Sequence, residues 1–398
     1  MYPDSDLVAH LVGFVGEATE QEVQYTRAGE LRLRGLVGKD GLEREYDGDL
    51  RGADGVRFVE VSAMGRLVRE AGAAPPLAPV PGRDVATTLD LNLQRYVARS
   101  FPAARRGAVV VMTPGTGEIL ALYSSPSFNP NAFVGGIDPV YWAALNRSEA
   151  HPLINRAIHA RYPPASTWKL VVAAMAMKRG IANLRTRMPE PCRGGLQYGN
   201  RYFRCWALQG HGSLDLEGAI AHSCDVYFYQ LGLKLGLTSF LEDAAAWGFR
   251  QKTGVDLPGE ITADFPAGRE YFDRRYGPNR WTPAVMLNLA IGQGENSQTL
   301  MKMVQFYAML AGEGRAPVPH LARGGTGSQP SLDVPPDELA AIRQSLIAVV
   351  EEGTGRGGRL RNITIAGKTG TAQNPFGPDH GWFIGFAPAA KPEVVVGA

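Results

Sequence analysis

The sequence predicts an α+β protein whose sheet is assembled from segments far apart in the chain. Strand-like apolar segments occur from Ala108 onward, in AVVVMTPGTGEILALYSS, and again from residue 362 to the end of the chain. The stretch between them consists mainly of helix-like segments rich in Ala, Leu and Met. Because strands at both ends surround a helical middle, these segments are expected to fold as one α+β unit.

Each element of this unit has a local signal in the sequence. A hairpin is expected from a strand that starts at Ala108, a turn with the sequence PGTG at 114–117, and a return strand from Glu118. A helix is expected after the Pro-Pro pair at 163–164 and should end near Gly180, because proline favours helix starts and glycine favours helix ends. Further helices are expected at DVYFYQLGLKLG, TSFLEDAAAWG, TLMKMVQFYAMLAGEG and DELAAIRQSLIAVVEEG, and final strands at NITIAGKTGTAQ, GWFIGFAP and EVVVGA.

The amino-terminal part of the chain has a different character. It is rich in glycine and charge, and the alternation in GVRFVEVSAMGRLV indicates short strands. The following segment, AGAAPPLAPVPGRD, is dense in Pro and Ala and is typical of an extended linker. We therefore assign residues 1–75 to a small β-containing domain, residues 76–84 to a linker and residues 85–398 to the main domain.

Composition excludes some classes of protein. The net charge is +2, the amino-terminal 80 residues are acidic and the rest is mildly basic, without the Lys/Arg run that would indicate nucleic-acid binding. No apolar stretch is long enough for a membrane span, and the start lacks the pattern of a signal peptide. The chain ends inside the strand-like run EVVVGA, so we expect a chain cut from a longer, anchored protein.

Ser166 and Lys169 form a Ser-x-x-Lys pattern at the start of a predicted helix. Residues three apart on a helix share a face, so the two side chains are expected to lie within hydrogen-bonding reach. A lysine kept partly desolvated and neutral can remove the proton of a serine and make it a nucleophile. A chain of this length contains such a spacing roughly once by chance, so the pattern needs support from other motifs.

Two further patterns are candidates for the same site. Ser223-Cys224-Asp225 offers a hydroxyl and a carboxylate between two predicted helices, although Ser-x-Asp also occurs at Ser213 and Ser331. The tripeptide Lys-Thr-Gly occurs at 252–254, where a Pro-Gly turn soon follows, and at 368–370, where strand-like residues lead in and another threonine follows. A strand carrying a lysine and hydroxyls can bind a carboxylate and an acyl group along its edge, so the second copy is the better candidate.

Ser-x-x-Lys, Ser-x-Asn/Asp and Lys-Thr-Gly, in this order, form the motif set of penicillin-binding proteins and class A β-lactamases. With its stretches RYPPASTWK, SCDVYFYQLG, IGQGENSQT and GKTGTAQ, the chain resembles the elongation-type branch of class B penicillin-binding proteins over nearly its whole length. The resemblance implies the transpeptidase fold, with a central antiparallel sheet flanked by helices, preceded by part of a non-catalytic pedestal domain.

The resemblance also implies a serine acyl-transfer mechanism. Ser166 would attack the carbonyl between the two terminal D-alanines of a peptidoglycan stem peptide, and Lys169 would act as the general base. Ser223 would relay the proton to the departing D-alanine, and Asp225 would polarise the network. Many relatives carry Asn at the position of Asp225, and often Gly at the position of Ala165, where alanine is expected to tighten the turn.

Substrate binding is implied for the third motif. Lys368 would hold the terminal carboxylate of the substrate with help from Thr369 and Thr371, and Gly370 would leave room for close backbone approach. The backbone N–H groups of Ser166 and Thr371 would form the oxyanion hole. β-Lactams would mimic the dipeptide and trap the serine, and no cofactor would be needed for the chemistry.

The three cysteines lie in one segment together with a histidine. Cys192, Cys205, His211 and Cys224 have the composition of a closed structural zinc site, although their spacing is looser than in a zinc finger. The resemblance to the elongation-type branch also implies a structural zinc here, as in some of its members, in which acidic residues replace some of the cysteines. The alternatives are a Cys192–Cys205 disulfide, which suits an extracytoplasmic protein, and free thiols.

Two other functions share part of the motif set. A class A β-lactamase needs a Glu-x-x-x-Asn segment for deacylation, and no Glu of this chain is followed four residues later by Asn. A β-lactam sensor or inactive scaffold is the non-enzyme alternative, although no hydroxyl or lysine of the three motifs is missing. The resemblance further implies a catalytic domain outside the inner membrane of a bacterium, anchored in full-length form, with a SEDS-type glycosyltransferase and elongation-complex proteins as partners.

Overall fold

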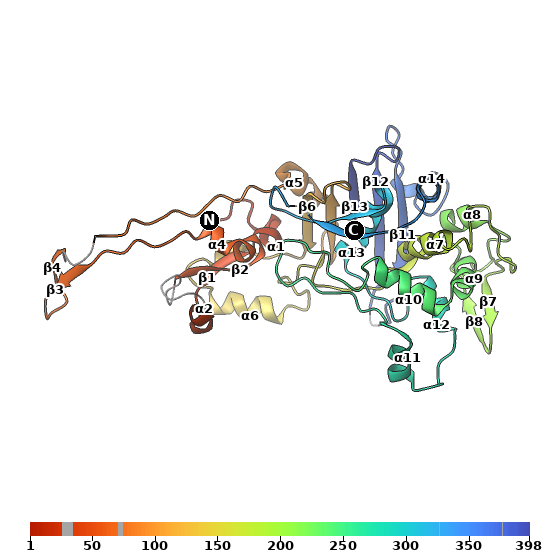
Figure 1. The fold of residues 1–398 in the computed structure, drawn as a ribbon, viewed down its shortest axis with the longest axis horizontal. Coiled ribbons are helices and arrows are strands. Elements are labelled where there is room, and N and C mark those ends of the chain that lie inside the picture. Colours follow the sequence, from red (N-terminus) through yellow and green to blue (C-terminus); the bar gives the residue numbers. More distant parts are fainter. Residues whose placement is uncertain (26–34, 71–74, 326, 376) are drawn as a thin grey trace. The chain divides into compact units, whose positions relative to one another are not determined.

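The computed structural model describes residues 1–25, 35–70, 75–325, 327–375 and 377–398, which form two compact units (Figure 1). The first unit comprises Met1–Thr87, Ser127–Leu153 and Asp256–Pro258, and the second comprises the rest. The first unit thus includes residues 127–153, from beyond the linker expected in the sequence. Residues 71–74, the start of the Pro- and Ala-rich segment that contains that linker, lie outside the described residues.

The first unit combines short strands with short helices. Strand β1 (Phe14–Glu17) pairs antiparallel with β2 (Leu36–Asp40), and β3 (Val59–Val61) pairs with β4 (Leu67–Glu70) in a separate hairpin. Ala9, Phe128, Phe133 and Leu145 form its main buried cluster, to which two separate segments of the chain contribute. Its helices are η1 (Ser5–Leu7), α1 (Ala9–Val12), α2 (Glu20–Tyr25), α3 (Gly41–Glu45), α4 (Asp47–Leu50), η2 (Pro130–Phe133) and α6 (Pro139–Arg147).

The second unit contains the predicted sheet. Five antiparallel strands follow the order β11-β12-β13-β5-β6, so the early hairpin and the last strands of the chain meet in one sheet, as the sequence predicted. Strand β11 lies at one edge, with Lys368 opposite Ile384 and Thr371 opposite Gly381 of β12. The strands are β5 (Gly107–Met112), β6 (Ile119–Ser125), β11 (Ala366–Ala372), β12 (His380–Ala387) and β13 (Val394–Gly397).

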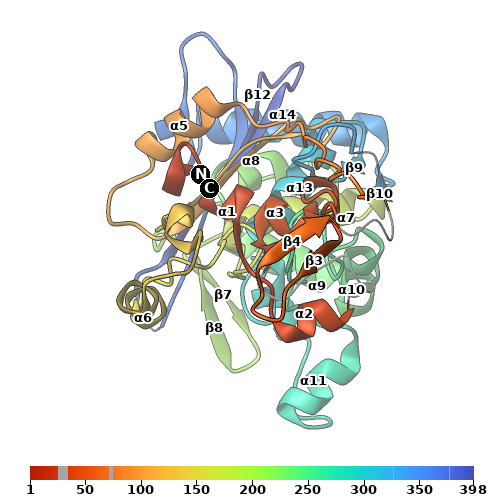
Figure 2. The ribbon, with the colours of Figure 1, turned by 90° about the vertical axis from the view of Figure 1, so that its left-hand side faces the viewer.

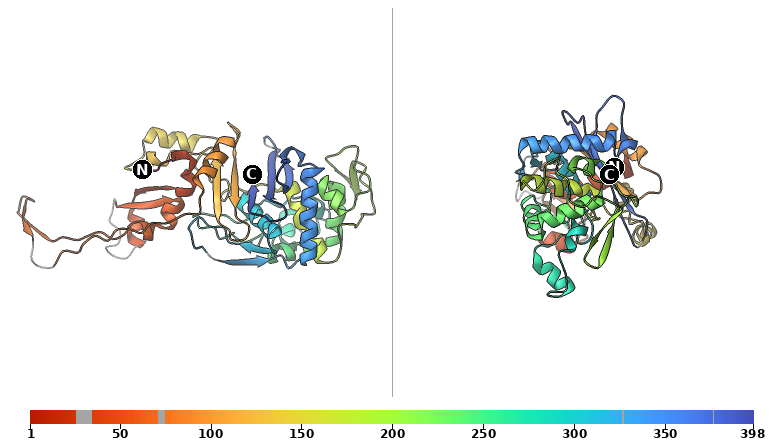
Figure 3. Two further views of the ribbon diagram at one scale, coloured as in Figure 1. Left: turned by 90° about the horizontal axis from the view of Figure 1, so that it is seen from above. Right: turned by 90° about the vertical axis from the view of Figure 1, so that its right-hand side faces the viewer.

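Helices cover this sheet. The central helix α7 (Lys169–Lys178) is apolar on all sides between its two terminal lysines, and residues 169–177 are all buried. Helix α14 (Pro336–Glu351) packs against β11, α7 and α8 (Figure 3), whereas α13 (Leu300–Ala311) packs against β5, β12 and β13. The other helices are α5 (Leu91–Ser100), η3 (Ala165–Trp168), α8 (Leu216–Ala221), α9 (Asp225–Leu235), α10 (Leu237–Ala246), α11 (Arg269–Tyr276), α12 (Val285–Ala290) and η4 (Arg356–Gly358).

Two small hairpins complete the second unit. Strands β7 (Gly195–Tyr198) and β8 (Arg201–Arg204) project from it on the same side as α11 (Figure 2), and β9 (Arg315–Pro317) pairs with β10 (Ser328–Ser331). Within the described ranges, no helix has both the length and the apolar character needed to cross a bilayer.

Candidate active site

The serine of the first motif lies in a 3₁₀ turn that leads into α7. Pro164 precedes the turn, and Ala165 within it is fully buried with φ +49°. The N–H of Ala165 donates to the carbonyl of Gly292 at 2.9 Å, and a Cβ at Gly292 would lie 2.3 Å from the carbonyl oxygen of Ala165. The left-handed conformation costs alanine about 1–2 kcal/mol, so packing against Gly292 has to maintain it. The turn leaves Ser166 half-buried.

Lys169 joins the first motif to the second. Its side chain is fully buried, and Nζ donates to the carbonyl of Ser223 at 2.7 Å, to Ser223 Oγ at 3.1 Å and to Asp225 Oδ1 at 2.7 Å. Asp225 carries a negative charge that the Asn of many relatives lacks, and its ion pair with Lys169 compensates this charge. Ser166 Oγ has no hydrogen-bond partner among the described side chains. Catalytic hydrogen bonds of this kind often tighten only when substrate is bound.

The second motif lies in the loop between α8 and α9, held by a residue that the sequence did not reveal. Ser223 is buried and has φ +54°, and Asp225 is the first residue of α9. The backbone N–H of Trp206 donates to Asp225 Oδ2 at 3.0 Å, and its indole N–H donates to the carbonyl of Ser223 at 3.0 Å. Lys169 and Trp206 thus share the same carbonyl as acceptor. The only sequence signal for Trp206 is its position directly after Cys205.

The third motif lies on edge strand β11. Lys368 is fully buried, and burial, together with the neighbouring charge of Lys169, lowers the pKa of its ammonium group. Nζ donates to the carbonyl of Thr369 at 3.1 Å. The hydroxyl of Thr369 is 2.8 Å from that of Thr354, a second residue that the sequence analysis did not assign. Thr371 is exposed at the end of the motif.

Gly370 brings the third motif against the first. A Cβ at this position would lie 3.2 Å from the carbonyl oxygen of Pro164 and 3.3 Å from the backbone nitrogen of Thr167. The small residue therefore allows β11 to approach the turn that carries Ser166. The sequence analysis expected Gly370 to leave room for close backbone approach, and its nearest neighbours are groups of the turn that carries Ser166.

The first Lys-Thr-Gly copy has a different environment. Lys252 is exposed, whereas Thr253 is fully buried and donates through both its N–H and its hydroxyl to Glu260 Oε1, each at 2.6 Å. The N–H of Gly254 donates to the other carboxylate oxygen at 3.1 Å. Glu260 therefore fixes this tripeptide in an irregular segment with a structural role.

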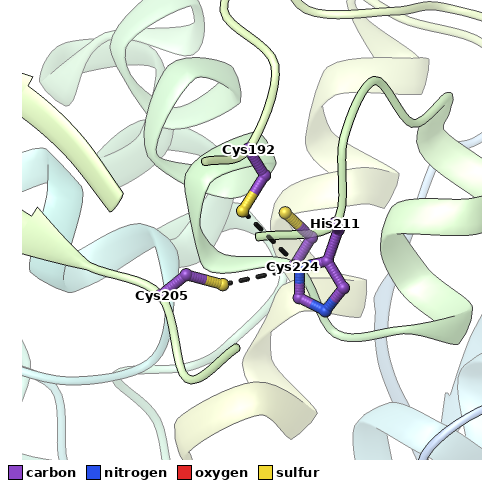
Figure 4. A group of neighbouring side chains, drawn as sticks. All are labelled: Cys192, Cys205, His211 and Cys224. Carbon is purple, nitrogen blue, oxygen red and sulfur yellow. Dashed lines mark hydrogen bonds between the residues drawn. The ribbon is translucent and has the colours of Figure 1, made fainter. Parts of the chain in front are cut away.

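The predicted metal ligands form one cluster (Figure 4). The ligand atoms of Cys192, Cys205, His211 and Cys224 all lie within 4.8 Å of one another, and His211 Nδ1 lies 3.6 Å from the sulfurs of Cys192 and Cys205. A tetrahedral zinc with Zn–S bonds of about 2.3 Å would place its sulfurs about 3.8 Å apart, which fits this spacing. All three cysteines are free, so the structure contains no Cys192–Cys205 disulfide.

Electrostatics in this cluster favour a thiolate. Hydrogen bonding with Cys224 and with His211 lowers the pKa of the Cys205 thiol, and the same contact with Cys205, together with burial, raises the pKa of the Cys224 thiol. Three sulfurs and one imidazole nitrogen form a donor set suited to zinc. Two residues of the cluster, Cys205 and Cys224, directly precede Trp206 and Asp225 in the chain.

Comparisons with known proteins agree with this geometry. Residues 107–398 match the family described as penicillin binding protein transpeptidase domain, and residues 1–87 match the penicillin-binding protein dimerisation domain. The chain therefore belongs to the penicillin-binding proteins that carry a transpeptidase domain.

Within that family, the similarity is to penicillin-binding protein 2. The chain is 36% identical to the peptidoglycan D,D-transpeptidase MrdA of Acinetobacter baumannii over 99% of its own length and 62% of the relative. Penicillin-binding protein 2 of Helicobacter pylori, solved in complex with MreC, superposes with a TM-score of 0.90 at 31% identity, covering 100% of this chain and 74% of that one. Penicillin-binding protein 2 of Pseudomonas aeruginosa, solved with WCK 5153, gives 0.88 at 34%, covering 100% and 84%. The chain thus spans less than two thirds of the length of the Acinetobacter relative.

Proposed function

We propose that this chain is the catalytic part of a peptidoglycan D,D-transpeptidase that forms an acyl-enzyme at Ser166 and is a target of β-lactams. One observation carries the proposal: a single buried lysine, Lys169, contacts Ser223 and Asp225 and also acts electrostatically on Lys368. The three motifs lie far apart in the chain, at 166–169, 223–225 and 368–370, and these interactions of Lys169 support one shared site at the turn that carries Ser166.

The proposed reaction has two stages. In the first, Ser166 Oγ attacks the carbonyl between two D-alanines while Lys169 takes its proton, and the proton passes through Ser223 to the amine of the departing D-alanine. In the second, an amine of another stem peptide attacks the ester, and the serine recovers a proton as the new amide forms. Lys169 has to be neutral when Ser166 attacks, so at least one of its hydrogen bonds to Ser223 and Asp225 must change at that moment.

Charge in the site supports the binding of a carboxylate. Lys368 is desolvated, and its charged form is disfavoured by burial and by Lys169. A terminal carboxylate would supply the counter-charge that Lys368 lacks, with the exposed hydroxyl of Thr371 beside it. The backbone N–H groups of Ser166 and Thr371 are the proposed oxyanion donors.

Location and partners are proposed from family membership. The full-length protein would be anchored in the inner membrane of a bacterium with the second unit outside the cytoplasm. It would act in cell elongation beside a SEDS-type glycosyltransferase. The complex of penicillin-binding protein 2 from Helicobacter pylori with MreC supports an elongation-complex partner for this chain as well.

A labelling experiment tests the activity. Incubation with fluorescent penicillin is expected to give one adduct, located on Ser166 by mass spectrometry, that persists for minutes, and Ser166→Ala should remove it. An adduct released within seconds would favour a β-lactamase, and failure to label would contradict the proposal. A stable adduct without turnover of any D-Ala-D-Ala peptide would favour the sensor or scaffold.

We also propose that Cys192, Cys205, His211 and Cys224 hold a structural zinc. The metal would fix the loop that carries Trp206 to the start of α9, and it would take no part in the acyl transfer. The compact donor set and the lowered pKa of the Cys205 thiol support this proposal.

Metal analysis of the purified protein is expected to find about one zinc per chain. His211→Ala should lose the metal and lower the thermal midpoint by more than about 4 °C, the shift that ~2 kcal/mol produces in a domain of this size. His222→Ala is the matched control, because this exposed histidine stacks near His211 but is not part of the donor set. A metal-free protein with a Cys192–Cys205 disulfide would contradict the proposal.

A further inference from the structure

A hollow of about 790 Å³ lies between the β7–β8 hairpin and residues 276–295. Its volume is in the range of sites that bind small molecules or side chains. Aromatic and charged residues line it, among them Tyr198, Arg201, Tyr276, Arg280, Trp281 and Glu295. None of the three sequence motifs contributes to it.

The charges in this hollow are unbalanced in favour of cations. Glu295 is already compensated, because its carboxylate accepts a hydrogen bond from the hydroxyl of Tyr276 and pairs with Arg275 at 3.5 Å. Arg201 and Arg280 form no ion pair with any acidic group in the described part of the chain. The guanidinium of Arg201 lies over the ring of Phe203, 4.9 Å from its centre, which orients it without neutralising it.

Two guanidinium groups facing one hollow suit a carboxylate. Arginine presents several N–H donors in a planar fork that matches the two oxygens of a carboxylate, and charge-assisted hydrogen bonds are stronger than neutral ones. The aromatic residues supply apolar surface for the carbon chain that bears the carboxylate. An amino-acid side chain with an acidic end fits this lining better than an apolar or a cationic one.

Both walls of the hollow continue into elements that hold the active site. Strand β8 leads through Cys205 to Trp206, which donates to Asp225 and Ser223. On the other wall, Asn288 accepts from the N–H of Gln293 at 2.9 Å.

The residue before Gln293 is Gly292, which packs against Ala165 beside the nucleophile. The two walls of the hollow are therefore connected, through Trp206 and Gly292, to the segments that carry Ser223 and Ser166.

We propose that this hollow is a second recognition site for the substrate peptide, in which Arg201 and Arg280 bind a side-chain carboxylate upstream of the terminal D-Ala-D-Ala. The inference rests on the proposed function and names a feature of its substrate. Penicillin carries no counterpart of this side-chain carboxylate. Binding of the peptide should therefore depend on Arg201 and Arg280, whereas acylation by penicillin should not.

Protection of Ser166 from fluorescent penicillin tests the inference without requiring turnover. The probes are a synthetic pentapeptide whose residue before D-Ala-D-Ala bears a side-chain carboxylate, and the same peptide with that carboxylate amidated. The carboxylate peptide is expected to protect the unmodified protein at concentrations about tenfold lower than the amide, since a charge-assisted hydrogen bond is stronger than a neutral one. Arg201→Gln with Arg280→Gln should abolish this difference while leaving penicillin labelling unchanged.

Arg204→Gln is the matched control, because this exposed arginine lies on the same strand but does not line the hollow. It should preserve the preference for the carboxylate peptide. Equal protection by the two peptides in the unmodified protein, or a preference that survives the double substitution, would overturn the inference. Loss of penicillin labelling in the unmodified protein would instead contradict the proposed function, so the two failures are distinguishable.

Discussion

Lys169→Met is expected to slow the acylation of Ser166 by fluorescent penicillin by about 10²–10⁴-fold, the usual contribution of a positioned general base. Methionine fills a similar volume in the buried site but cannot accept the proton of Ser166. It also leaves Asp225 without its cation, so the thermal midpoint should fall. The measurement is the second-order rate constant of labelling, obtained from rates at several penicillin concentrations and compared with that of the unmodified protein. Circular dichroism checks that the variant is folded.

Two further variants separate chemistry from folding. Lys169→Met combined with Asp225→Asn removes the unpaired carboxylate and should recover much of the stability but not the rate. Lys302→Met removes another buried lysine, whose pKa burial lowers to about 8 and whose Nζ donates to Gln305, and it should leave acylation unchanged. Acylation of Lys169→Met within tenfold of the unmodified protein would show that another group is the base.

Lys368→Ala is expected to reduce acylation by about 10²–10³-fold, comparable to the loss of one preorganised donor in other acyl-transfer sites. The lysine is desolvated and lies within the electrostatic reach of Lys169, so the carboxylate of penicillin would lose a counter-charge that water cannot replace there.

The chain provides its own control for this experiment. Lys252→Ala changes the same tripeptide at an exposed position where Glu260 holds the neighbouring threonine, and labelling should be unaffected. Similar losses in the two variants would mean that Lys368 acts on stability rather than on substrate.

Much of the fold could be predicted because its signals are local. The hairpin from Ala108, the helix after Pro164 and the strand of the second Lys-Thr-Gly are each marked by periodicity and by turn residues, and all three are observed. By contrast, the sequence did not predict that residues 127–153 belong to the first unit. Their assignment depends on contacts such as Ala9 with Phe128, which no local pattern encodes.

The candidate site shows the same division. Its lysines and hydroxyls could be ranked by motif and order, whereas Trp206 and Thr354 could not, because each acts through a hydrogen bond to a residue distant in the sequence. The tripeptide at 252–254 resembled a surface turn, yet Thr253 is fully buried. A short motif identifies the side chains that are present, whereas their burial depends on the tertiary packing around them.

The position of β11 at the edge of the sheet has a consequence for the behaviour of the protein at high concentration. Proteins usually protect a sheet edge with proline, inward-pointing charge or a covering segment, because an open edge pairs with strands of other molecules. If β11 receives a peptide, as proposed above, its edge cannot be blocked in these ways without preventing substrate binding. The open edge would then also be a place where unwanted association between copies can begin, and its shortness, from Ala366 to Ala372, limits that risk.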